Sequence, residues 1–341
     1  MSEAKVFELS NFKLTNGITL PQARIVYQTY GTLAPDRSNV ILYPTSYGAQ
    51  HSDIEWLISP DGILDPTRWF VVVPNMFGNG LSSSPSNLAA FETVVQFSHD
   101  DNVHAQARLL REVFGISHLA LVYGWSMGAQ QAFYWAALYP NQVARVAALC
   151  GTARTTDHNT VFLNSLESAL QADPCWDGTR FTDIPTRGFR AFARIYASWA
   201  ASQAFYRAGI YRQLGYSSLE DYLVRAWEAS YRRRNPMDLL AMLSTWRRCD
   251  VSANPTFEGN LKRALGSITA RVLVMPSTTD LYFTPEDCEA NAAAIPHATF
   301  LPIPSLWGRR AGNPYQHPPD AQFIRKAVQG LLSEETATPK N

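Results

Sequence analysis

The sequence lacks three features: a surplus of charge, a long apolar run and a cysteine pattern. Its 341 residues include 29 basic and 29 acidic side chains, so charge gives no reason to expect nucleic acid or a membrane surface as a partner. No uncharged apolar stretch approaches the ~18 residues that a membrane-spanning helix needs. The first residues, MSEAKVFELSNFKL, lack the basic and apolar regions of a signal peptide. We therefore expect a cytoplasmic protein.

Cysteine and cofactor-binding motifs are equally sparse. The four cysteines contain no Cys-x-x-Cys pair, which argues against both a zinc site and a disulfide framework. They are Cys150, Cys175, Cys249 and Cys288. The sequence also has no phosphate-binding loop, dinucleotide fingerprint or cluster of metal ligands. We therefore expect no cofactor and no metal.

Strand and helix patterns are abundant. Asn16-Gly17, flanked by FKLT and ITLP, is the strongest hairpin signal in the first 35 residues. Short apolar runs then alternate with helical patterns, which predicts a mostly parallel sheet with helices on both faces. The expected strands are residues 40–44, 69–74, 119–123, 144–150, 271–275 and 299–303, and the expected helices are 102–115, 127–138, one that begins at 285, and 319–332.

One stretch interrupts this alternation. Residues 151–265 are rich in aromatic side chains and arginine, have helical spacing and show no convincing strand. A helical insertion between two sheet strands explains the pattern, and such caps usually cover an active site. We therefore divide the chain into a first core part (1–150), a cap (151–265) and a second core part (266–341).

The chemistry centres on Gly124-Trp125-Ser126-Met127-Gly128, a Gly-x-Ser-x-Gly motif between an expected strand and an expected helix. A sharp turn there needs glycines, because a Cβ would strike the neighbouring backbone. The turn would present the hydroxyl of Ser126 as a nucleophile and leave the N–H of Met127 free to bind an oxyanion. The alternative is an ordinary glycine-rich turn around a buried serine.

A second oxyanion donor should come from the loop after the first long core strand. Ser46 and Tyr47 are the best placed candidates there, although the loop could be only a turn. The sequence does not decide which N–H would serve.

The acid and the base should follow the serine in the order Asp or Glu, then His. Asp280 lies just after the strand that follows the cap; the alternative is a solvated loop aspartate. Glu286 and Asp287 are less suitable because they begin a helix. Of the seven histidines, only His317 follows the last expected strand. Its alternative is an exposed histidine before a helix.

Several segments together resemble a known family. They are TYG with LAPDRSNVILYPTSYGAQH, WFVVVPNMFGNGLSSSPSN, DNVHAQARLL, GWSMGAQQAFYWAALYP and MPSTTDLYFTPED. The chain resembles the homoserine O-acetyltransferase-like branch of the α/β-hydrolase superfamily over nearly its whole length. The resemblance implies the α/β-hydrolase fold with a helical lid, Ser126 as nucleophile and Asp280 as the triad acid.

Two departures from that family matter. True homoserine acetyltransferases have a Gly-Gly-Ser-Met-Gly-Gly elbow, whereas this chain has Trp125 before the serine, so it is closer to relatives known as plain α/β-fold hydrolases. Those relatives also have Trp-Gly-His in the last loop, where this chain has Arg309. An arginine stays protonated near neutral pH and cannot accept the serine proton. It could pair with Asp280 or hold an anionic group, and we assign Arg309 and Trp125 to substrate binding.

These residues predict a serine-dependent ester or thioester hydrolase, or an acyltransferase, that acts through an acyl-enzyme on Ser126 with Asp280 and His317 as a shifted triad. Hydrolysis and transfer share that intermediate and are not separated by the sequence. The expected partner is a small-molecule ester or an acyl donor, with acyl-CoA among the candidates, and a homodimer stays open. Because of Arg309, two alternatives stay open too: a ligand-binding pseudo-hydrolase or a non-hydrolytic cyclase or lyase, and a purely structural subunit.

Overall fold

One sheet runs through the residues that the structure, a computed structural model, describes: 4–88 and 95–334. Within this part of the chain it has eight strands in the order β1-β2-β4-β3-β5-β6-β7-β8. β2 pairs antiparallel with β1 and β4, and the other neighbouring pairs are parallel. The strands are β1 (Lys5–Lys13), β2 (Thr19–Tyr30), β3 (Val40–Leu42), β4 (Phe70–Pro74), β5 (Leu121–Trp125), β6 (Arg145–Leu149), β7 (Arg271–Met275) and β8 (Ala298–Phe300).

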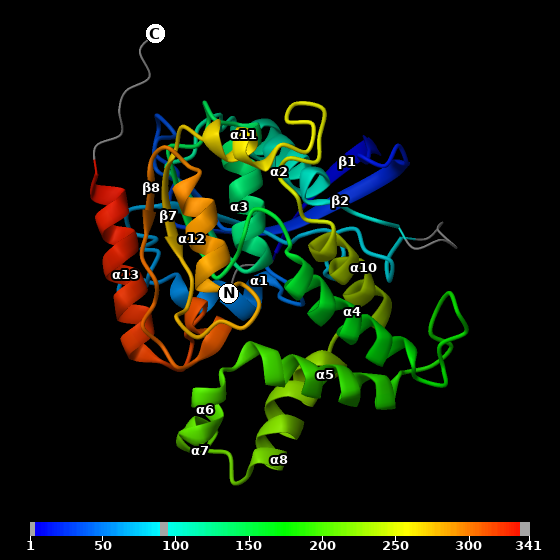
Figure 1. Cartoon of the computed structure of the whole chain (residues 1–341). Helices are drawn as coiled ribbons and strands as arrows, with labels where there is room; N and C mark the ends of the chain where they lie inside the picture. The colour runs from blue at the N-terminus through cyan, green and yellow to red at the C-terminus, as the bar shows by residue number, and fades with distance from the viewer. Residues whose placement is uncertain (1–3, 89–94, 335–341) are drawn as a thin grey trace.

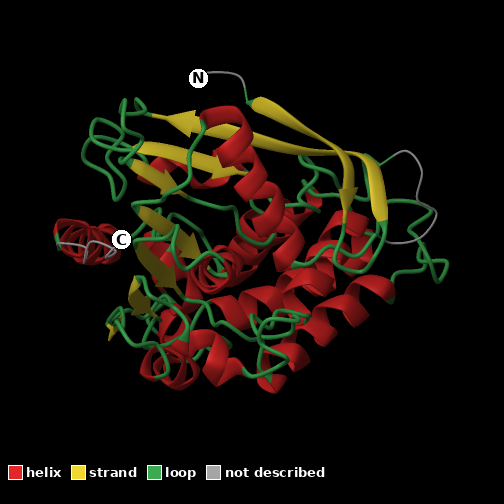
Figure 2. Cartoon of the chain, turned by 90° about the horizontal axis from the view of Figure 1, so that it is seen from above, coloured by secondary structure: helices red, strands yellow, loops and turns green. Residues whose placement is uncertain are grey.

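Helices connect these strands and lie on both sides of the sheet (Figure 2). Outside the insertion they are α1 (His51–Ile54), α2 (His99–Phe114), α3 (Met127–Leu138), α12 (Pro285–Ala293) and α13 (Pro318–Ser333), with short 3-10 helices at Glu55–Leu57 and Gly308–Gly312. No helix in the described part of the chain is both long and apolar enough to cross a membrane.

The insertion between β6 and β7 is helical. Its helices are α4 (Asp157–Gln171), α5 (Thr186–Ala200), α6 (Gln203–Arg207), α7 (Ile210–Gln213), α8 (Leu219–Tyr222), a π-helical turn (Leu223–Glu228), α9 (Ala229–Arg232), α10 (Pro236–Arg247) and α11 (Leu261–Gly266). Figure 1 shows α5 to α8 as a separate layer beside the sheet, whereas α11 lies near α2. We call α4 to α10 the cap.

The sheet separates two apolar cores, because alternate strand residues point to opposite faces. Val40 and Leu42 pack on the side of α2, α3, α11 and α12. Ile41 and Tyr43 pack on the side of α13 and the cap. Burial on both faces explains why the core strands are unbroken apolar runs. It also means that the cap shares one continuous core with the sheet.

The expected strands and helices are confirmed, with differences at their ends. α2 begins at His99 and not at residue 102, because the Ser98 hydroxyl accepts a hydrogen bond from the N–H of Asp101. The Asp101 carboxylate in turn accepts from the N–H of Ser98, which completes a capping box. β8 ends at Phe300 and not at residue 303, although the N–H groups of Leu301 and Ile303 still donate to the carbonyls of Val274 and Pro276.

Candidate active site

The Gly-x-Ser-x-Gly motif forms the predicted sharp turn between β5 and α3. Ser126 has φ 57° and ψ −123°, a backbone conformation that residues other than glycine rarely adopt. A Cβ on Gly124 would collide with the carbonyl oxygen of Gly128. One on Gly128 would lie 2.8 Å from the carbonyl oxygen of Pro44. Both glycines are therefore required by close backbone contacts, as the sequence predicts.

Donor groups for an oxyanion lie next to this turn. Met127 is the first residue of α3, so its N–H has no acceptor within the helix. On the opposite side, residues 46–49 form a turn in which the N–H of Ala49 donates to the carbonyl of Ser46 (3.1 Å). The ring of Tyr47 stacks on Tyr196 of the cap, with centroids 5.9 Å apart, which fixes the loop against the cap.

Asp280 lies in the loop after β7, where the sequence predicts the acid. Its side chain is 5% exposed, and its Oδ1 accepts hydrogen bonds from the N–H groups of Tyr282 and Phe283, both at 3.1 Å. Its Oδ2 has no hydrogen-bond partner among the described residues. Burial raises the pKa of Asp280 from 3.8 to about 6, although the two N–H groups and the charge of Arg309 act in the opposite direction.

This raised pKa predicts a pH-dependent gain in stability for Asp280→Asn. The folded protein holds the Asp280 proton more tightly than the unfolded chain does, so ionisation between pH ~4 and ~6 costs stability that stays lost at higher pH. From a shift of this size, we expect the substitution to raise the free energy of unfolding at pH ~8 by up to ~3 kcal/mol and to change it little at pH ~4. Urea unfolding at both pH values measures this. An equal gain at both would contradict the raised pKa.

Arg309 lies beside Trp125 of the serine turn and near Asp280. Its side chain is 7% exposed, and its guanidinium carbon lies 4.3 Å from the ring centroid of Trp125. The rings of Tyr196 and Tyr282 lie 5.6 and 5.8 Å away. Its Nε has no hydrogen-bond partner within residues 4–88 and 95–334. Arg309 is thus a buried cation in an aromatic cage, close enough to Asp280 to affect its pKa.

The loop that carries Arg309 is attached to both neighbouring parts of the site. The Trp125 indole N–H donates to the carbonyl oxygen of Arg309 (3.2 Å). The Thr279 hydroxyl accepts from the N–H of Gly308 (3.1 Å) and donates to the carbonyl of Ser305 (2.8 Å). These contacts fix the backbone of residue 309 independently of its side chain.

His317 is not part of this arrangement, so the structure does not support the predicted shifted triad. Its Nδ1 lies 2.9 Å from Oδ2 of Asp320 on α13. The hydroxyl of Ser126 and the Oδ2 of Asp280 lack any hydrogen-bond partner in the described ranges, His317 included. The reason is that Pro318 begins α13 directly after His317, which fixes the histidine at the start of that helix.

Among the cavities of the described residues, one of about 300 Å³ lies beside Gln50, Asn79 and Arg234, and two others lie at opposite ends of the sheet. The larger, about 780 Å³, is at the amino-terminal ends of β6, β7 and β8, at the opposite end of the sheet from the turn that carries Ser126. The smaller, about 240 Å³, lies between the cap and the carboxyl ends of the strands, where ligands bind in open α/β sheets. Its lining includes Tyr47, Trp125, Trp227, Tyr231 and Arg309. We call it the cap cleft. The described residues form no group of three or more His, Cys, Asp or Glu side chains that could hold a metal ion.

The pattern of the family described as "alpha/beta hydrolase fold" matches residues 48–305. The chain belongs to the α/β-hydrolase family. The ethyl acetate hydrolase of Pseudomonas veronii is 36% identical over 311 residues, which cover 89% of this chain and 88% of that protein. The homoserine O-succinyltransferase of Methylibium petroleiphilum is 30% identical over 308 residues, covering 80% of this chain and 79% of that protein.

A solved structure agrees with these sequence relatives. The acetyl esterase MekB matches this chain with a TM-score of 0.93 at 32% identity, covering 98% of this chain and 97% of that one. The comparisons confirm the resemblance to the branch that contains homoserine acyltransferases. This α/β-hydrolase is therefore an enzyme of the ester hydrolase or acyltransferase type.

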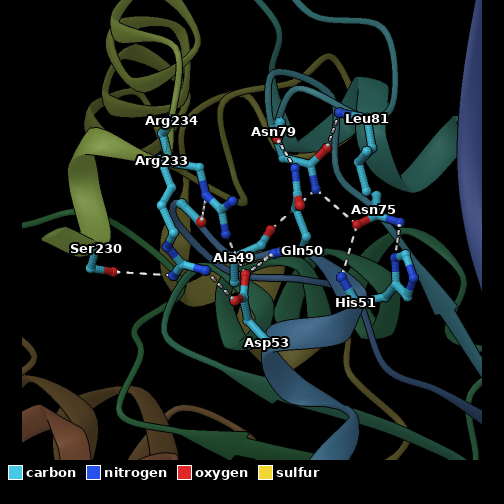
Figure 3. A network of polar contacts seen from close by, with 11 residues as sticks. Ala49, Gln50, His51, Asp53, Asn75, Asn79, Leu81, Ser230, Arg233 and Arg234 are labelled. Atoms are coloured by element: carbon cyan, nitrogen blue, oxygen red, sulfur yellow. Dashed lines mark hydrogen bonds and ion pairs between the residues drawn. The ribbon is translucent and has the colours of Figure 1, made fainter. Parts of the chain in front are cut away.

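Some residues of this α/β-hydrolase site carry no signal in the sequence. Tyr196 and Tyr282, which flank Arg309, are indistinguishable from other core aromatics. Arg234, which lies against the loop after β3, is one of three consecutive arginines. Figure 3 shows that it contacts Asp53 and the backbone of that loop. Only the folded cap distinguishes it from its neighbours.

Proposed function

We propose that the enzyme transfers the acyl group of a small ester or acyl donor to Ser126, and from there to water or an acceptor. The conformation of Ser126 carries this proposal. A serine held at positive φ stores ~1–3 kcal/mol of strain, which persists only where the surrounding structure enforces it, and such strain clusters at active sites. The names of two relatives, ethyl acetate hydrolase and acetyl esterase, support a short acyl group.

The charge that develops on the substrate oxygen would be stabilised by two backbone donors. One is the N–H of Met127, and the other is an N–H from the loop that contains Ser46 and Tyr47. Preorganised N–H groups in a water-excluded site act most strongly on the transition state, because they need no reorganisation when the charge appears.

Proton transfer is the step in which this chain differs from enzymes that have a complete Ser-His-Asp triad. Ser126 follows β5 and Asp280 follows β7, and β6 lies between them. Two strand spacings are ~10 Å, so the carboxylate would not reach the serine without an intermediate group. The charged side chain that lies beside Trp125 and near Asp280 is Arg309, which cannot accept a proton. We therefore propose that acylation is slow, since loss of a triad base costs several orders of magnitude while binding and the oxyanion donors retain part of the catalysis.

Arg309 and Trp125 would then bind the substrate. Arg309 lines the cap cleft, and a planar guanidinium can hold a carboxylate through two parallel hydrogen bonds. We propose that the preferred substrate is a small ester that carries a carboxylate. The esterase and acyltransferase relatives favour this function over a ligand-binding protein, a lyase or a cyclase.

Covalent labelling tests the nucleophile. A fluorophosphonate probe is expected to add slowly to the peptide that contains Ser126, because the turn presents the serine hydroxyl beside the oxyanion donors although no base accepts its proton. Peptide mass spectrometry after incubation between pH ~6 and ~9 identifies the labelled residue. Ser46→Ala is the matched control, since it removes another buried hydroxyl without a partner but keeps the backbone N–H. Labelling should survive in that variant and disappear in Ser126→Ala. No adduct on the wild-type chain at any of these pH values would refute the proposal.

A further inference from the structure

The cap contacts the loop after β3 and α1 through Tyr196, which stacks on Tyr47, and through Arg233 and Arg234, which both pair with Asp53. Arg234 directly follows α9 and Arg233, and its Nε donates to the carbonyl oxygen of Gly48 (2.7 Å). The guanidinium also pairs through Nη2 with Oδ2 of Asp53, on α1. The arginine side chain is 11% exposed, so both contacts are largely shielded from water. Two charge-assisted contacts from one largely buried guanidinium position a backbone more strongly than an exposed ion pair does.

The carboxylate of Asp53 also links Arg234 to residues next to the sheet. Oδ2 of Asp53 accepts the N–H of Gln50 (2.9 Å), and the Gln50 side chain donates to the carbonyl of Asn79 (3.3 Å). The Asn79 amide donates to the carbonyl of Ala49 (3.1 Å). Figure 3 shows these contacts as one network that surrounds residues 49–53 from the cap and from the sheet.

The position of Gly48 makes this network relevant to catalysis. Gly48 is the third residue of the turn 46–49 and has φ 66°, a conformation that favours glycine at this turn position. Within such a turn, the orientation of one peptide group determines that of the next. The Gly48 carbonyl shares a peptide group with the N–H of Ala49, which donates to the carbonyl of Ser46, so a contact that fixes this carbonyl holds closed the turn that carries the N–H groups of Ser46 and Tyr47.

We propose that Arg234 is a positioning residue that aligns the second oxyanion donor, so that the oxyanion site is complete only when the cap is seated on the loop after β3. This inference rests on the proposed function. Arg234 itself touches neither substrate nor the reacting atoms. It acts through Gly48, and Asp53 holds it in place.

The test compares two neutral substitutions in the same run of arginines. Arg234→Gln removes the contacts with Gly48 and Asp53. Arg232→Gln is the matched control: it changes the net charge equally, but Arg232 is 50% exposed and pairs only with Glu228 within the described residues, at 3.4 Å. Hydrolysis of p-nitrophenyl acetate gives kcat and KM, and inhibition by a trifluoromethyl ketone, which forms a tetrahedral adduct with the serine, reports oxyanion stabilisation.

For Arg234→Gln we expect kcat to fall ~10–100-fold with KM changed less than ~3-fold, because oxyanion donors act mainly on the transition state. The affinity for the ketone should fall by the same factor as kcat. Arg232→Gln should change each quantity less than ~2-fold. A rise in KM with kcat unchanged, or equal effects of the two substitutions, would overturn the inference.

Two further measurements keep the result interpretable. Thermal unfolding shows whether Arg234→Gln folds. If it does not, Asp53→Asn is measured instead, because it removes the carboxylate that pairs with Arg234. This variant should lower kcat by a similar factor. Unchanged kcat in a folded Asp53→Asn variant would then overturn the inference. Failure of the wild-type chain to label at Ser126 would refute the proposed function, whereas normal labelling with an unaffected Arg234→Gln variant would refute this inference alone.

Discussion

Arg309→His is expected to hydrolyse a neutral activated ester such as p-nitrophenyl acetate ~10²–10³ times faster than the wild-type chain, because it supplies the missing general base. The backbone at this position is held by Trp125 and Thr279, so the new imidazole should occupy the space of the guanidinium. Oδ2 of Asp280 is free to accept the imidazole N–H, which would hold the ring in the tautomer that can receive the serine proton.

Two control variants distinguish the effect of the new base on the rate from the effect of losing the positive charge of Arg309. Arg309→Gln removes the charge without adding a base and should not accelerate hydrolysis. Arg310→His places a histidine one residue further, where the wild-type side chain contacts the hydroxyl of Tyr222 in the cap (2.9 Å), and should likewise have no effect. Steady-state rates on the neutral ester report whether residue 309 acts as a general base. Rates on a succinate monoester report whether residue 309 binds the substrate carboxylate.

With the succinate monoester, Arg309→His should raise KM, because the cation proposed to hold the carboxylate is lost. If the histidine variant is no faster than the glutamine variant on the neutral ester, then residue 309 does not occupy the position of the base. If KM for the succinate monoester is the same in all variants, Arg309 does not bind the substrate.

Ser126→Ala is expected to remove turnover of the ester, with a loss of at least ~10³-fold measured in the faster Arg309→His background. Without the hydroxyl no acyl-enzyme forms, and only the oxyanion donors and binding act on the bound ester. Rates on p-nitrophenyl acetate, corrected for spontaneous hydrolysis, measure the effect. Residual activity close to that of Arg309→His alone would show that another residue is the nucleophile.

Ser126→Gly provides a second measurement at the same position. Glycine also abolishes the nucleophile, but it adopts positive φ without strain, whereas alanine keeps the strain. We expect Ser126→Gly to be more stable than Ser126→Ala by ~1 kcal/mol in urea unfolding, since the relief of strain exceeds the extra chain entropy of glycine. Equal stability of the two variants would mean that the turn stores no strain.

The fold was largely predictable from the sequence, because its determinants are local. The unbroken apolar runs specify strands buried on both faces, and Gly124 and Gly128 are required by backbone contacts within one turn and with the adjacent strand end. Asp280 was predictable as a candidate for a related reason: its place directly after β7 follows from chain order. That it is the acid remains a proposal.

The rest of the site depends on contacts between distant segments. The cage around Arg309 combines residues of β5, the cap and the loop after β7, and no spacing in the sequence reveals that combination. His317 satisfied the rule of chain order but is fixed at the start of α13 by the proline that follows it. Arg234 differs from its neighbouring arginines only through the loop that the folded cap brings to it.

The hydrogen bond between the Trp125 indole and the carbonyl of Arg309 joins residues 184 positions apart. Contacts of such sequence separation form late in folding, because the loop between them must close first. The turn around Ser126 can form as soon as β5 and α3 meet, but the group that faces it comes from the last segment to dock. Partly folded chains would therefore contain a finished nucleophile turn without the side chain that we propose binds the substrate. Acquisition of activity during refolding would report the docking of the C-terminal segment rather than the formation of the sheet.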